Sequence, residues 1–121
     1  MDMGLFSKSN RDRCEAENGF NHKLNSWSLS DWFTACLGEL GEAANVAKKL
    51  NRIRDDIPGN KENEQALRQK LKHELADTFI YLDLLTQAAG IDLDDAVQAA
   101  FNQKSGDIGY GRRLTHTGGT I

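Results

Sequence analysis

Proline, which interrupts helices, occurs only once in this chain, at Pro58, and apolar residues recur at helical spacing on both sides of it. The alternation of apolar and polar residues that is typical of strands is scarce. Helices are expected at about 10–24, from 28 or 30 to 52, at 62–89 and at 92–104. Two long and two shorter helices predict an all-α fold, an antiparallel bundle of the four-helix type.

Several of these helices have boundary signals. Ser28 followed by Asp31 has the form of a capping box with Asp in place of Glu. Gly90 stands where a helix commonly ends, with apolar Ile91 after it in the manner of a Schellman motif. Asp92 is a favourable residue for the start of the next helix.

The length of 121 residues predicts a single domain, 1–121. Residues 1–9 and 106–121 are expected to be flexible or extended tails, because the stretch from 105 onward has five glycines and no clear period. A bundle this thin buries little core by itself. We therefore expect the core to be completed by self-association into a homodimer or homotetramer.

Composition excludes several classes of protein. A net charge of −3 argues against a surface that coats nucleic acid, which would normally be strongly basic. No apolar run approaches the length of a membrane span, and 1–10 lacks the apolar region of a signal peptide. Cys14 and Cys36 form neither a disulfide framework nor a CxxC motif, so a reducing, cytoplasmic setting is expected.

Four acidic residues form two pairs on the two long helices: Glu39 with Glu42, and Glu74 with Asp77. Residues three apart share a helix face, so each pair projects two carboxylates in one direction. At about 100° per residue, Glu39 and Glu74 lie in the middle of an apolar stripe, and the other two lie about 60° to its side. The apolar residues in line with Glu39 are Trp32, Ala43, Val46 and Leu50, and those in line with Glu74 include Leu67, Leu71, Leu82 and Leu85.

Carboxylates turned toward an apolar interface need partners, because an unpaired buried charge costs several kcal/mol or more. Oxygen ligands of this kind select hard divalent ions, so the pattern predicts Mg²⁺, with Mn²⁺ as a substitute. The alternatives are a solvated helix face and an interface paired with lysines of a second subunit. Neither pair has the histidine of a di-iron Glu-x-x-His motif, and His73 points about 100° away from Glu74, which disfavours iron and zinc.

Three short runs resemble the MazG-like, all-α nucleoside triphosphate pyrophosphohydrolases. They are Gly-Glu-Leu-Gly-Glu-Ala-Ala-Asn at 38–45, Lys-Lys-Leu at 48–50 and Glu-Leu-Ala-Asp-Thr at 74–78. The likeness covers about 20–105. It implies that the four acids hold Mg²⁺ and are catalytic. It also implies cleavage of (deoxy)nucleoside triphosphates to a monophosphate and pyrophosphate.

Three points stay open at this stage. The general base is one of two residues, Glu39 or Glu42. The scaffold could cleave another phosphoanhydride, such as phosphoribosyl-ATP. A non-catalytic helical oligomer, with the acids used for subunit pairing, is the alternative from a different class of protein.

The resemblance also suggests contacts to the nucleoside. Trp27 would stack on the base, or else anchor local packing. Tyr81, one turn beyond Asp77, would pack on the deoxyribose, or else serve as a core aromatic. Trp32 lies on the apolar stripe and is expected to be structural.

Five further residues are candidates for contacts to the triphosphate. Asn45 and Lys49 follow Glu42 and could reach phosphate oxygens, or could lie on a solvated face. Asn102 and Lys104 belong to a segment that resembles the ending of phage-type relatives. Arg112 could contact phosphates if the tail folds back.

Overall fold

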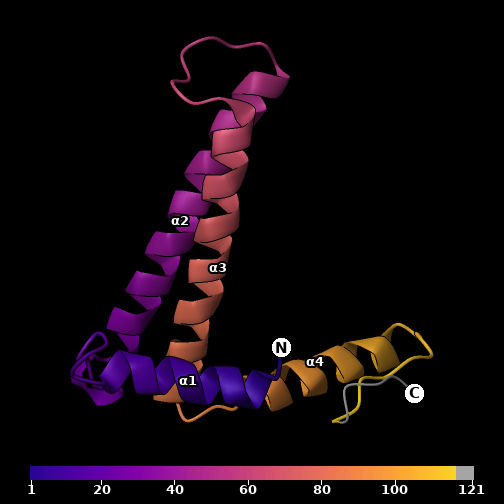
Figure 1. The fold of residues 1–121 in the computed structure, drawn as a ribbon. Helices are drawn as coiled ribbons and strands as arrows, with labels where there is room; N and C mark the ends of the chain where they lie inside the picture. Colours follow the sequence, from indigo (N-terminus) through magenta and orange to yellow (C-terminus); the bar gives the residue numbers. More distant parts are fainter. Residues whose placement is uncertain (117–121) are drawn as a thin grey trace.

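The computed structural model describes residues 1–116 (Figure 1). Over this range the chain is all-helical, with no strand, which confirms the predicted fold class. The two long helices form an antiparallel hairpin, the first helix lies across its base, and the last leads away from it (Figure 1). In chain order the elements are α1 (Met3–Glu15), the 3-10 turn η1 (Leu24–Ser26), α2 (Leu29–Arg54), α3 (Glu64–Ala88) and α4 (Leu93–Asp107).

The hairpin of α2 and α3 begins and ends close to the predicted boundaries. The capping box at the start of α2 is confirmed: the Ser28 hydroxyl accepts from the Asp31 amide, and the Asp31 carboxylate accepts from the Ser28 amide. Asn63 caps α3 by accepting from the amide of Ala66. Val46 of α2 and Leu67 of α3 are buried along the hairpin, as their place on the apolar stripes predicts.

The first helix was predicted wrongly at both ends. It begins at Met3, so residues 3–9 are helical rather than a flexible tail, and Asp2 caps it through the amide of Leu5. It ends at Glu15 instead of near residue 24, because Gly19 lets the chain fold back over the last turn. A Cβ on Gly19 would lie 2.0 Å from the carbonyl oxygen of Arg13.

A buried polar group fixes α1 on α3. The Asp83 side chain is fully buried and accepts hydrogen bonds from Ser7 Oγ, Asn10 Nδ2 and Gln87 Nε2 at 2.5, 2.9 and 3.0 Å. Satisfied networks of this kind hold elements in one register, because each lost partner would leave a buried group unpaired. The core beside it consists of Cys14, Leu24, Trp32, Leu84 and Leu85.

The expected Schellman motif ends α3: Gly90 has φ +73°, and the Ile91 amide donates to the Thr86 carbonyl at 2.8 Å. The tail that follows α4 returns along it, because the Asn102 side chain both donates to and accepts from the backbone of Leu114. Helix α4 itself continues to Asp107, three residues beyond its expected end at residue 104. The remainder of the expected tail, 117–121, lies outside the described residues.

Among the described residues, no helix combines the length and the apolar character that a membrane span requires.

Candidate metal and substrate site

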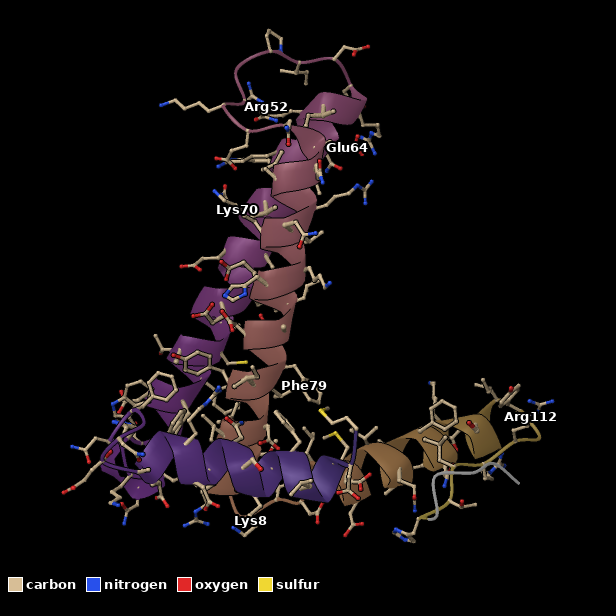
Figure 2. All side chains as sticks on the ribbon, viewed as in Figure 1. Lys8, Arg52, Glu64, Lys70, Phe79 and Arg112 are labelled. Atoms are coloured by element: carbon tan, nitrogen blue, oxygen red, sulfur yellow. The ribbon has the colours of Figure 1, made fainter. Side chains whose placement is uncertain are left out.

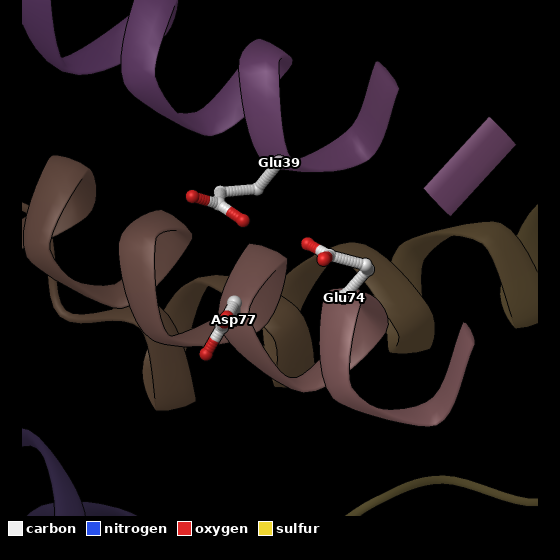
Figure 3. Close-up of side chains that lie close together, drawn as sticks. All are labelled: Glu39, Glu74 and Asp77. Atoms are coloured by element: carbon white, nitrogen blue, oxygen red, sulfur yellow. The ribbon is translucent and has the colours of Figure 1, made fainter. Parts of the chain in front are cut away.

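Three of the four predicted acids converge between α2 and α3. Glu39 of α2 reaches toward Glu74 and Asp77 of α3 (Figure 3). One carboxylate oxygen from each lies within 4.8 Å of the others, and all three side chains are half-buried. The two helices bring the acids together because Glu39 and Glu74 occupy the stripes that the hairpin buries, and Asp77 lies at the edge of one of them.

The fourth acid, Glu42, stands beside this group and is exposed. The adjacent Glu74 carboxyl, through its close side-chain contact and its negative charge, raises the pKa of the Glu42 carboxyl. The acids therefore repel one another without a cation.

Protein cations do little to offset this charge. Among residues 1–116, no lysine or arginine forms an ion pair with Glu39 or Glu74. His73 Nε2 lies 3.2 Å from Asp77 Oδ2, a contact that its four-residue spacing allows and that the sequence analysis missed. The Glu74 Oε2 atom is buried without a hydrogen-bond partner. An all-oxygen donor set with an unsatisfied buried oxygen fits a hard divalent cation.

A cavity of about 320 Å³ opens beside Glu39 and Asp77. It lies between α1, the segment before α2, and the base of the hairpin. Trp27 and Tyr81 line it, so both predicted nucleoside contacts lie next to the acids. Its other lining residues are Asn10, Arg13, Cys14, Phe20, His22, Trp32, Ile80 and Leu84.

Edge-to-face contacts join three of the rings at this cavity. The centroid of His22 lies 4.4 Å from that of Trp27, and the centroids of Trp27 and Trp32 lie 4.7 Å apart. Trp32 is buried and its Nε1 donates to the Leu24 carbonyl, so the structural role predicted for it is confirmed. The sequence analysis missed His22, because it lies in an irregular segment without periodicity to orient it.

An open groove of about 460 Å³ lies on the other side of the acids, along Glu42 and Glu74. Asn45 and Lys49, both predicted to contact phosphates, line it. Lys70 also lines it and was missed. Its signal was present, since Lys70 precedes Glu74 by one helical turn and therefore shares its face.

Three predicted substrate residues do not join this site within one chain. Asn102 and Lys104 belong to α4, and Arg112 lies beyond its far end, away from the hairpin (Figure 2). The Asn102 amide is occupied by the backbone of Leu114. The resemblance of the segment around Asn102 and Lys104 to phage-type relatives did not predict the direction of α4. That direction depends on the turn at Gly90.

Comparison of this chain with protein families, with curated proteins and with solved structures finds no match, so the site rests on its own geometry.

Proposed function

We propose that this protein is a Mg²⁺-dependent nucleoside triphosphate pyrophosphohydrolase of the MazG-like kind, which cleaves between the α- and β-phosphates. One observation carries the proposal: carboxylates from two helices converge between an aromatic cavity and a groove that contains lysines. A nucleoside triphosphate is arranged in the same order, because it has a flat, aromatic base at one end and anionic phosphates at the other.

Glu39, Glu74 and Asp77 are the residues that would hold the cation, and Mn²⁺ could replace Mg²⁺. Such an ion, when bound, would neutralise phosphate charge and lower the pKa of a bound water. Glu42 stands outside the three-acid group, and in this proposal its carboxylate takes the proton from water as that water attacks the α-phosphorus. The bond between the α-phosphorus and the bridging oxygen breaks, and pyrophosphate leaves with the electron pair of that bond.

The aromatic cavity supports a role in binding the nucleoside. Trp27 offers a ring face or edge to a base, and Tyr81, one helical turn beyond Asp77, lines the same cavity. Burial, followed by the charges of Glu39 and Asp77, raises the pKa of Tyr81. Its hydroxyl therefore stays protonated at neutral pH and can donate a hydrogen bond to a sugar or phosphate oxygen.

The test is pyrophosphate release from each of the eight common ribo- and deoxyribonucleoside triphosphates with Mg²⁺. We expect turnover of at least one of them, loss of turnover with EDTA, and a loss of more than about 100-fold in Glu39→Gln and Asp77→Asn. Glu17→Gln, an exposed acid outside the site, is the matched control and should keep full activity.

Two results would redirect the proposal. Turnover of phosphoribosyl-ATP alone would favour the related phosphoanhydride reaction. Absence of turnover on every nucleotide, with a melting temperature that EDTA leaves unchanged, would favour the non-catalytic helical oligomer.

We also propose that the protein assembles as a homodimer or homotetramer. Phe33, Leu37 and Leu40 lie on α2 at spacings of four and three residues, and their exposed fractions are 55%, 62% and 47%. Residues at these spacings share a helix face, so they form an apolar patch that a second subunit could cover. Light scattering should give a mass of two or four chains, and a monomeric mass at micromolar concentration would contradict this.

We propose a cytoplasmic setting as well, because Cys14 and Cys36 form no disulfide bond with each other.

A further inference from the structure

Two lysines lie on the same side of the acids, toward the loop that joins α2 to α3. Lys70 precedes Glu74 by four residues on α3, a displacement of about 6 Å along the helix. Lys49 follows Glu42 by seven residues on α2, about 10 Å. Because the two helices are antiparallel, both displacements point toward the loop. Figure 2 shows Lys70 on the part of the hairpin nearer to the loop.

The carboxylate of Glu62 stands between these two ammonium groups. Its oxygens lie 3.1 Å from Lys70 Nζ and 4.0 Å from Lys49 Nζ. The close contact with the Lys70 ammonium, together with the charges of both lysines, lowers the pKa of the Glu62 carboxyl. Two lysines from different helices thus converge on one anionic group.

The loop that carries Glu62 is fixed at several points. Asn60 Nδ2 donates to the Lys49 carbonyl at 2.7 Å, and Arg52 Nη2 donates to the Pro58 carbonyl at 2.5 Å. Gly59 has φ +120° and lies against the Arg52 guanidinium, where a Cβ would be 2.7 Å from Nη2. These hydrogen bonds from side chains to backbone carbonyls position the loop from which Glu62 reaches the lysines.

The arrangement at the loop end suits a larger anion. Two ammonium groups from different helices face the single Glu62 carboxylate, and Glu42 and Glu74 lie one to two helical turns farther from the loop. A diphosphate carries more negative charge and more acceptor oxygens than a carboxylate, and can bond both lysines at once. The groove that Lys49 and Lys70 line is continuous with Glu42 and Glu74, so an anion leaving the acids in this direction meets the lysines.

We infer that Lys49 and Lys70 form the subsite for the leaving diphosphate, and that Glu62 occupies this subsite in the free protein as an internal competitor. This inference rests on the proposed function for the direction of the leaving group. It assigns selectivity for triphosphates over monophosphates to the loop end of the hairpin. Lys70 and Glu62 then have opposite effects on anion binding.

The test is direct binding of inorganic pyrophosphate with Mg²⁺, by titration calorimetry on the full chain. We expect Lys70→Gln to weaken binding about tenfold, the loss typical of one hydrogen bond to a charged group. Lys72→Gln is the matched control: it makes the same charge change on an exposed side chain of α3 that does not line the groove, and it should bind as the unaltered protein does. Glu62→Gln should tighten binding several-fold.

Either of two results would overturn the inference. If Lys70→Gln and Lys72→Gln bind pyrophosphate equally, no subsite exists at Lys70. If Glu62→Gln weakens binding, Glu62 holds the lysines in place and does not compete. Far-ultraviolet circular dichroism and melting temperature establish that each variant folds.

The readout separates this inference from the proposed function. Pyrophosphate binding that depends on Lys70, without turnover of any triphosphate, would uphold the subsite and refute the enzyme. Triphosphate turnover, with pyrophosphate binding that Lys70→Gln leaves unchanged, would uphold the enzyme and refute the subsite.

Discussion

The two depressions beside the acids differ in how they are built. The aromatic cavity needs three parts of the chain: α1, the segment between α1 and α2, and the base of the hairpin. The groove is lined by α2 and α3 alone, with Lys49 and Lys70 facing the acids. The hairpin by itself thus supplies all the charged groups of the groove, whereas the aromatic wall depends on the docking of α1.

This difference separates two kinds of recognition. A partly enclosed apolar space favours a flat, weakly hydrated base, because burial and ring contacts provide the binding free energy. An open groove in water favours an anion, because charge-assisted hydrogen bonds tolerate exposure better than apolar contacts do. Substitutions at the two ends should therefore affect different parts of the same ligand.

The larger effect is expected at the aromatic end. Trp27→Ala should raise the KM for a nucleoside triphosphate by roughly 5- to 150-fold, because stacking on a base contributes about 1–3 kcal/mol. Pyrophosphate contains no base, so its affinity should not change. Steady-state kinetics and calorimetry on the same preparation measure both quantities.

Phe101→Ala is the control for this substitution, since Phe101 is an exposed aromatic residue of α4 that lines neither the cavity nor the groove. Trp27 also contacts Trp32, so the melting temperature must be compared with that of the unaltered protein. If Trp27→Ala weakens pyrophosphate and nucleotide equally, the two depressions are not independent and the comparison fails.

A smaller effect is expected at the acids between the two ends. The pKa of Glu42 is raised above its ordinary value of 4.5, so the folded state holds this proton more tightly than the unfolded state does. Stability is then lost as pH rises from the unfolded pKa through the folded one, so a penalty is present at pH 7. Glu42→Gln removes it, and should raise the melting temperature in metal-free buffer at pH 7 by a few degrees.

The gain should disappear near pH 4, where Glu42 is protonated in the unaltered protein as well. Glu17→Gln, remote from the site, should show no such pH dependence. A lower melting temperature for Glu42→Gln at pH 7 would mean that the Glu42 carboxylate stabilises the hairpin by more than its repulsion from Glu74 destabilises it.

The sequence predicted the hairpin and its acids well because both depend on local rules. Periodicity fixed the faces of α2 and α3, and the capping residues fixed their ends within about two residues of the prediction. It failed for α1, whose end depends on the close approach of Gly19 to Arg13 and whose start lies in a segment expected to be a tail. His22 and Lys70 were missed for different reasons. His22 lies in an irregular segment without periodicity, whereas Lys70 shares the helix face of Glu74 and could have been predicted from its spacing.

By itself, then, the sequence determined that the chain is helical and that two acidic pairs interrupt the buried faces of two long helices, because these features follow from spacing along the chain. Only the tertiary structure decided what surrounds the acids. Contacts between separate parts of the chain, such as Asn10 with Asp83 and Lys49 with Glu62, set the cavity on one side and the lysines on the other. Such contacts depend on the angles at which helices leave their turns, and a one-dimensional pattern does not contain those angles.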